Sequence, residues 1–105
     1  MHIIYCTTKN KEEALTISST LIKESLAACT NILDGMTSVY MWEGKVEESS
    51  EAILIVKTNA TMVPAVIKRI EEIHSYEVPC VFSIKIEECS KDFLKWLETS
   101  LKLPY

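Results

Sequence analysis

Long apolar runs are missing from this sequence, and the residues that build special loops are few. No uninterrupted apolar stretch approaches the roughly 20 residues that a membrane-spanning helix needs, so we expect no membrane span. Glycine occurs only at Gly35 and Gly44, and arginine only at Arg69. An acylphosphatase-like enzyme needs a phosphate-cradling loop close to an arginine. The composition disfavours enzymes of that type, and we expect a protein that binds rather than catalyses.

Positive charge is also scarce. Lysine and arginine number 11 against 15 aspartates and glutamates, which gives a formal net charge of −4. Phosphate backbones and anionic lipids require a basic face, and an RNA-recognition module requires exposed aromatics in a basic strand. We therefore expect no nucleic acid partner. The amino terminus shows neither the basic flank nor the apolar segment of a signal peptide, which predicts a cytoplasmic protein.

The four cysteines follow no local metal motif. Cys6, Cys29, Cys80 and Cys89 are separated by 22, 50 and 8 residues, and none of these spacings is the C-x-x-C of a zinc ribbon or an iron–sulfur run. In a reducing compartment these residues are expected to be free thiols. A metal site would have to be assembled in space.

The composition, length and apolar patterns of the sequence predict one α+β domain covering residues 1–105. The composition is 48% hydrophobic and 25% charged, which is typical of a globular chain, and 105 residues are too few for two cores. Apolar and capping patterns predict strands at 2–8, 30–42, 45–58 and 81–86, and helices at 11–28, at 61 to about 74, and after Ser90. Asp34-Gly35 predicts a bend or bulge, and Glu43-Gly44-Lys45 a hairpin turn.

This order of elements is that of a ferredoxin-like βαββαβ sandwich with an extra C-terminal helix and a long hairpin formed by the second and third strands. Right-handed crossovers predict an antiparallel sheet with strand order 4-1-3-2 and helices on one face. The topology brings one set of scattered residues to the same end of the sheet: Cys6, His74, Tyr76, Glu77 and Cys80.

The other face of the sheet is left bare by this arrangement, because the helices cannot cover both sides. Tyr5, Val39 and Ile55 are expected on it. An apolar face of that extent marks an interface, and the projecting hairpin offers an edge for a neighbouring strand. Self-association in a closed ring is the economical arrangement.

Three segments carry a family resemblance: LAACTNI at 26–32, TSVYMWEGK at 37–45 and HSYEVP at 74–79. Together they resemble the CutA family of divalent-cation tolerance proteins over nearly the whole chain. The resemblance implies a homotrimer associated with copper and other divalent metals, with no established enzymatic reaction. It implies a cytoplasmic location in bacteria and an organellar or secretory one in some eukaryotes.

The resemblance also assigns roles to individual residues. Cys6 and His74 fall where family members have proposed copper ligands. Four residues fall on positions that line the cleft between subunits, namely Trp42, Lys57, Tyr76 and Glu77. Cys29 is assigned to the same cleft.

Chemistry adds Cys80 to Cys6 and His74 as a soft-metal set, because copper(I) favours thiolate. The alternative is that Cys6 and Cys29 are small buried hydrophobes and that His74 interacts with a helix dipole. Tyr40 and Trp42 lie two apart on one strand face. They are expected to pack into the next subunit at a trimer interface, or else to form a stacking wall for a ligand.

Two other functions stay open at this point. One is a trimeric sensor that binds a small molecule in the cleft and signals to an unidentified protein partner. The other is a structural trimer that anchors another protein. An organic molecule that co-purifies with the native protein would indicate the sensor, and co-purified copper would indicate the metal-binding protein.

Overall fold

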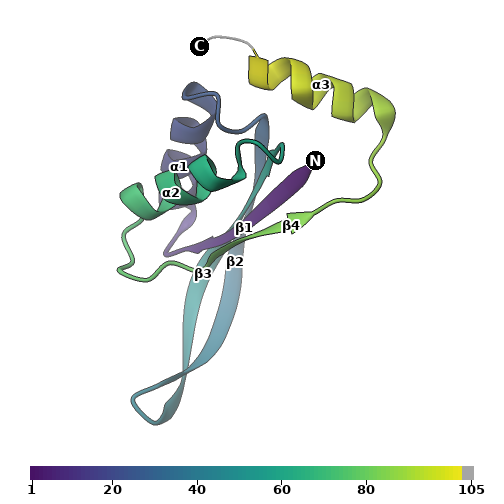
Figure 1. Cartoon of the computed structure of the whole chain (residues 1–105). Coiled ribbons are helices and arrows are strands. Elements are labelled where there is room, and N and C mark those ends of the chain that lie inside the picture. Colours follow the sequence, from purple (N-terminus) through teal and green to yellow (C-terminus); the bar gives the residue numbers. More distant parts are fainter. Residues whose placement is uncertain (103–105) are drawn as a thin grey trace.

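The computed structural model describes residues 1–102. The elements follow in the order β1 (His2–Thr8), α1 (Lys11–Lys23), β2 (Cys29–Trp42), β3 (Lys45–Thr58), α2 (Val63–Ile73), β4 (Val81–Lys85) and α3 (Lys91–Lys102). The strands form one antiparallel sheet in the order β2-β3-β1-β4, which confirms the predicted ferredoxin-like topology. Figure 1 shows α1 and α2 together, with α3 lying apart from them.

The helix boundaries follow from their caps. Asn10 Oδ1 accepts the Glu13 N–H at 2.8 Å, which confirms the predicted start of α1. The prediction that α1 continues to Ala28 is wrong. The helix ends at Lys23, and Ser25 adopts a left-handed φ of +58° that turns the chain toward β2.

The caps of the other two helices differ in how well sequence predicts them. Ser90 Oγ accepts the Phe93 N–H at 3.2 Å, as expected for α3. The helix expected from residue 61 begins at Val63. Met62 is the N-cap residue of α2 and makes no side-chain cap hydrogen bond; Asn59 Oδ1 accepts the Met62 N–H at 3.0 Å in the turn between β3 and α2.

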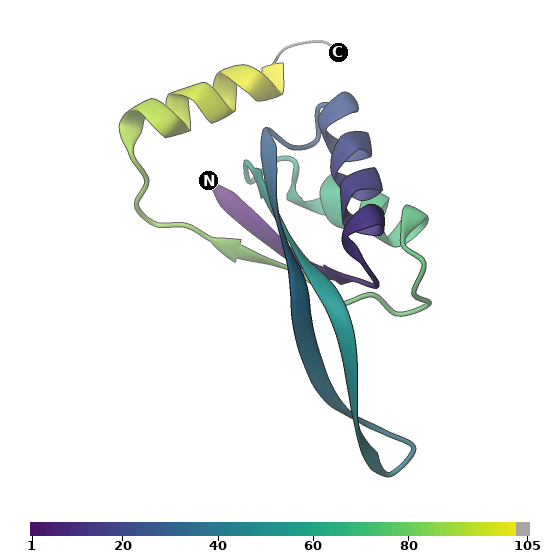
Figure 2. The same ribbon diagram turned by 180° about the vertical axis from the view of Figure 1, so that it is seen from behind.

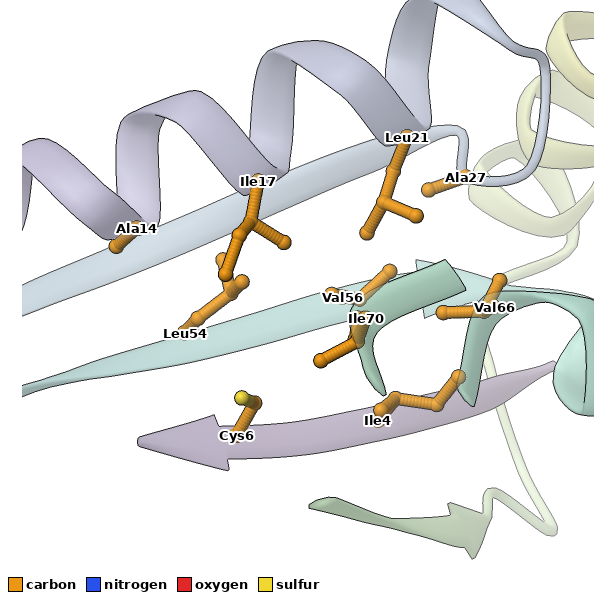
Figure 3. Close-up of a cluster of buried hydrophobic side chains, with 10 residues drawn as sticks. All are labelled: Ile4, Cys6, Ala14, Ile17, Leu21, Ala27, Leu54, Val56, Val66 and Ile70. Carbon is orange, nitrogen blue, oxygen red and sulfur yellow. The ribbon is translucent and has the colours of Figure 1, made fainter. Parts of the chain in front are cut away.

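The hydrophobic core lies between the sheet and the pair α1 and α2 (Figure 3). Both helices direct their apolar stripes onto alternate residues of β1 and β3, because successive strand side chains point to opposite faces. The fully or almost fully buried residues of this core are Ile4, Cys6, Ala14, Ile17, Leu21, Ala27, Leu54, Val56, Val66 and Ile70.

The β2–β3 hairpin extends well beyond the rest of the sheet, as both views show (Figures 1 and 2). Each of its strands has 14 residues, against 7 in β1 and 5 in β4. At the tip Trp42 pairs with Lys45, so Glu43 and Gly44 form a two-residue turn. Their φ angles of +49° and +79° are those of a type I′ turn, which matches the strand twist.

A β-bulge interrupts β2 at the predicted place. Leu33 pairs with Ile53 and Met36 with Glu51, so Asp34 and Gly35 together oppose a single β3 residue. Gly35 has a φ of +71°, which glycine adopts without strain, and its N–H donates to Asp34 Oδ1 at 2.8 Å. The extra residue moves every side chain beyond it to the face opposite from the one that simple alternation predicts.

The sheet face away from α1 and α2, which we call the open face, carries Ile3, Tyr5, Ile53, Ile55, Phe82 and Ile84. Tyr5 and Phe82 stack there with ring centroids 5.0 Å apart, and Phe82 and Ile84 are each 46% exposed. The prediction for Tyr5 and Ile55 is thus confirmed. Val39 is exposed but lies on the other side of the hairpin, because the bulge shifts the alternation by one residue.

Candidate ligand cleft at the base of the hairpin

A cavity of about 810 Å³ opens where the hairpin leaves the sheet. Its walls come from β1, both hairpin strands and the loop between α2 and β4. The lining residues are Thr7, Tyr40, Trp42, Glu47, Ser49, Glu51, Tyr76, Glu77, Val78 and Cys80. This volume lies within the range of small-molecule binding sites in proteins.

The hairpin wall follows from strand alternation. Glu47, Ser49 and Glu51 are alternate residues of β3, and Tyr40 is paired directly opposite Glu47. Trp42 continues the same face of β2 toward the tip. On this face of the hairpin the aromatic side chains of β2 lie beside the acidic side chains of β3, and the predicted sharing of one face by Tyr40 and Trp42 is confirmed.

The loop wall is fastened to β1 through His74. The His74 Nε2 lies 2.8 Å from the Thr7 carbonyl oxygen, and Nδ1 accepts the Tyr76 N–H at 3.0 Å. Because Nδ1 acts as an acceptor, Nε2 carries the proton and donates it to Thr7. Both ring nitrogens are thus occupied, and His74 positions Tyr76 in the cleft wall.

Tyr76 and Glu51 meet across the cleft. The Tyr76 hydroxyl donates to Glu51 Oε2 at 2.8 Å. Burial, followed by the neighbouring Glu51 carboxylate, raises the pKa of Tyr76 to about 12. The phenol keeps its proton at any physiological pH and remains a hydrogen-bond donor to the carboxylate.

Cys6 lies in the core and not in the cleft. Its side chain is on the same side of β1 as Ile4 (Figure 3) and is fully buried, whereas Thr7 faces the cavity. Burial, and to a lesser degree Cys80, Glu13 and Glu51, raises the pKa of Cys6 to about 12. A thiol that stays protonated is a poor nucleophile and a poor metal ligand.

We expect the free energy of unfolding to fall as the pH rises from 9 to 10. The Cys6 thiol ionises near its ordinary pKa of 9.0 in the unfolded chain but near 12 in the native state, so the native state binds more protons in this range. The slope for one such group approaches about 1.4 kcal/mol per pH unit. Urea unfolding of the wild type and Cys6→Ala at pH 8, 9 and 10 should give a shallower pH dependence of the free energy of unfolding for Cys6→Ala. Equal slopes in the wild type and Cys6→Ala would contradict this account.

The expected soft-metal set is not assembled within residues 1–102 of one chain. No group of three or more histidine, cysteine, aspartate or glutamate side chains is arranged there to hold a metal ion. Cys6 is buried and protonated, and His74 has both nitrogens occupied. Cys80 is exposed and lines the cleft, so it is the one member of the set that a metal can reach directly.

Two residues assigned to the cleft by resemblance lie at the other end of the sheet. Cys29 and Lys57 are paired with each other across β2 and β3, where Lys57 also pairs with Ile3. The Lys57 ammonium lies 5.6 Å from the ring centroid of Phe93. Burial raises the pKa of Cys29, and the nearby Lys57 charge opposes that rise. In one chain, then, Trp42, Tyr76 and Glu77 share the cavity and this pair does not.

Sequence reasoning missed part of the cleft. In the sequence alone Glu47 and Glu51 look like ordinary surface glutamates of the hairpin, yet Glu51 is 8% exposed and both line the cavity. The sequence does contain one signal for this wall of the cleft: Glu47, Ser49 and Glu51 alternate along a strand and so share one face. That signal identifies a shared face and not a cavity.

The layered fold and the aromatic, acidic cavity beside its hairpin define a ferredoxin-like α+β protein with a surface cleft. None of the helices within residues 1–102 is both long and apolar enough to span a membrane. The chain belongs to the CutA1 family: the family described as "CutA1 divalent ion tolerance protein" matches residues 2–100.

Individual relatives agree with this assignment. The chain is 39% identical to the divalent-cation tolerance protein CutA of Thermus thermophilus, covering 90% of this chain and 92% of that one. It is 38% identical to the rice chloroplastic protein CutA 1, covering 95% of this chain but 56% of that protein. The chain thus spans about half the length of its plant relatives.

Solved structures confirm the fold. The CutA1 structure from Ehrlichia chaffeensis superposes with a TM-score of 0.95 at 32% identity, covering 97% of this chain and 95% of that one. The structure described as the periplasmic divalent cation tolerance protein CutA of Archaeoglobus fulgidus gives 0.92 at 39% identity, covering 97% and 100%.

The expectation of a cytoplasmic protein is not upheld. Relatives include chloroplastic plant proteins and a protein described as periplasmic. The amino-terminal pattern on which the expectation was based therefore does not determine the compartment of a protein of this family.

Proposed function

We propose that this protein is the non-enzymatic subunit of a homotrimer that acts in divalent-cation tolerance by binding a ligand in its cleft. The family membership supports the role in divalent-cation tolerance. The trimer and the copper ligand are what the sequence resemblance implies, and the structure offers physical reasons for the first of them.

The observation that carries the proposal is the large total surface of one chain, together with the large apolar side chains exposed on it. A compact monomer of 11.9 kDa has a total accessible surface of about 6,000 Å², whereas this chain exposes 6,764 Å². On the side of the hairpin opposite the cleft, which we call the outer hairpin, Val39, Met41 and Val46 are each more than 60% exposed, in addition to the apolar residues of the open face. Apolar patches of this size mark protein interfaces, and contact with further copies would bury them.

Self-association also accounts for the division of the predicted cleft residues. Cys29 and Lys57 lie at one end of the sheet, and Trp42 and Tyr76 lie at the other. A cleft between subunits unites them if the hairpin of one copy lies along the sheet of the next. The open edge of β2 offers unpaired backbone groups for that contact.

Copper is the metal that the resemblance implies. Binding through Cys6 would require ionising a buried thiol, and binding through His74 would require breaking one of its two hydrogen bonds. The exposed Cys80 thiol requires neither change. We therefore assign the first contact with copper(I) to Cys80.

We expect Cys80→Ser to weaken copper(I) binding at least about tenfold, because thiolate is the preferred ligand of this ion. Competition with a chromogenic copper(I) chelator under anaerobic conditions measures the affinity. Cys6→Ser is the matched control and should retain wild-type affinity. Loss of copper(I) binding in Cys6→Ser with full retention in Cys80→Ser would reverse the assignment.

A sensor of a small molecule is the second candidate function. The observation that favours it is the cavity itself, which has the volume of a small-molecule site and aromatic walls. Both candidates use the same cleft and the same assembly.

A further inference from the structure

The loop between α2 and β4, which forms one wall of the cleft, is held by contacts at both of its ends. At its start the His74 ring lies 2.8 Å from the Thr7 carbonyl oxygen of β1. At its end the Cys80 carbonyl accepts the Thr7 N–H at 3.4 Å. A further contact reaches the start of the loop from the first turn of α1, and its donor is the Ser75 N–H.

Glu13 makes this contact, and it uses both oxygens of its carboxylate. Its Oε1 accepts the Lys9 N–H at 3.1 Å, which fastens the side chain to the turn that precedes α1. Its Oε2 accepts the Ser75 N–H at 2.8 Å, 62 residues away along the chain. Glu13 stands three residues after the Asn10 cap, the position from which a glutamate reaches back to the start of its own helix. The second oxygen is thereby aimed at the loop.

The negative charge of Glu13 strengthens both bonds. Burial alone would raise the pKa of Glu13, but hydrogen bonds from Ser75 and Lys9, together with the nearby His74, lower it below its ordinary value of 4.5. The side chain is therefore a carboxylate at neutral pH. Hydrogen bonds from N–H groups to a carboxylate are about twice as strong as those to a neutral acceptor. The bond to Ser75 is thus a firm attachment of the loop.

This attachment lies next to the residue that meets the hairpin across the cleft. Ser75 precedes Tyr76 in the chain, so the backbone at Ser75 determines where the Tyr76 ring enters the cavity. The Tyr76 N–H donates to His74 Nδ1, and its hydroxyl donates to Glu51 Oε2 at 2.8 Å. Both bonds require the loop to keep one conformation. Releasing Ser75 would loosen both of them.

From these contacts we propose that Glu13 is a positioning residue of the cleft, which holds the α2–β4 loop through Ser75 so that Tyr76 meets Glu51. The inference rests on the proposed function of the cleft as a ligand site, and it adds a residue that shapes the site from outside its lining. Glu13 belongs to α1, on the side of the sheet opposite the open face. A neighbouring copy that covers the open face therefore leaves this contact in place.

Hydrogen exchange of backbone amides in the wild type and in Glu13→Ala tests the proposal. The Lys9 and Ser75 amides lose their acceptor, so they should exchange faster whatever else Glu13 does. The Tyr76 amide donates to His74 and not to Glu13. It should exchange about tenfold faster only if Glu13 positions the loop, because exchange then follows local opening. The amides of β3 should keep their wild-type rates, which excludes a general loss of stability.

The Tyr76 side chain gives a second readout that needs no ligand. Incorporation of 3-fluorotyrosine labels the four tyrosines of the chain, and Tyr76→Phe assigns the resonance of interest. We expect this resonance to shift in Glu13→Ala because the ring leaves Glu51. The resonance of Tyr5, which stacks on Phe82 at the open face, should stay where it is.

Glu12→Ala is the matched control, because it removes a neighbouring carboxylate from the same helical turn and leaves the contact to Ser75 intact. It should change neither the Tyr76 exchange rate nor its resonance. Glu13→Gln keeps the length of the side chain and is the variant to use if Glu13→Ala does not fold. Its amide has one acceptor oxygen for two N–H groups, so the Tyr76 amide should exchange about threefold faster.

An unchanged Tyr76 in Glu13→Ala and Glu13→Gln would overturn the inference, and so would an equal change in Glu12→Ala. Faster exchange that spreads to β3 would also overturn it, because Glu13 would then support the whole fold and not the loop. The mass of the assembly and the copper(I) affinity of Cys80 decide the proposed function separately.

Discussion

Replacing Ile55 with lysine should reduce the proposed homotrimer to single chains and lower the melting temperature by at least about 12 °C. Ile55 lies at the centre of the open face, paired with Tyr5 and half-buried even in one chain. In the assembly a lysine there would be an uncompensated buried charge, which costs about 3–5 kcal/mol. For a domain of this size each kcal/mol corresponds to about 4 °C or more.

Light scattering after gel filtration and thermal unfolding at one protein concentration measure both effects. Ser19→Lys is the matched control, because it introduces the same charge at an exposed position of α1, on the layer that covers the other side of the sheet. The control should keep the wild-type mass and melting temperature. An Ile55→Lys protein that retains both would show that water and not another subunit covers this face.

Leu54→Ala should lower the free energy of unfolding by about 3 kcal/mol. Leu54 is fully buried between the sheet and α1, close to Ile17 and Ile70 (Figure 3). Truncation removes buried apolar atoms and leaves a cavity that the surrounding backbone cannot close, and such substitutions cost about 2–5 kcal/mol.

The control for this truncation is Leu15→Ala, because Leu15 is exposed on the outer side of α1. It should change the free energy of unfolding by less than about 0.5 kcal/mol. Urea unfolding of both variants at equal chain concentration is the measurement, since an assembly makes stability depend on concentration. Similar losses for Leu54→Ala and Leu15→Ala would contradict the assignment of the core.

The sheet order and most element boundaries were predictable because local signals and global topology agree. The Asn10 cap, the bulge at Asp34 and Gly35, and the Ser90 cap each depend on one or two neighbouring residues. The end of α1 was not predictable from periodicity, because apolar residues continue to Ala28. What ends the helix is the left-handed turn at Ser25, where no glycine marks it.

The candidate site was predictable in its location and not in its details. The topology correctly brought the α2–β4 loop to the end of β1, which the His74 contact to the Thr7 carbonyl shows. Which side chains face the cleft depends on strand alternation and on contacts across the sheet. Cys6 therefore fell in the core one residue away from Thr7, and Glu51 became part of the cleft although it resembled a surface glutamate.

The most direct test of the account is sedimentation equilibrium of the wild-type chain at about micromolar concentration, where a stable assembly persists. We predict a single species with three times the 11.9 kDa mass of the chain. A folded species with the mass of one chain would contradict the account, because the open face and the outer hairpin would then face water.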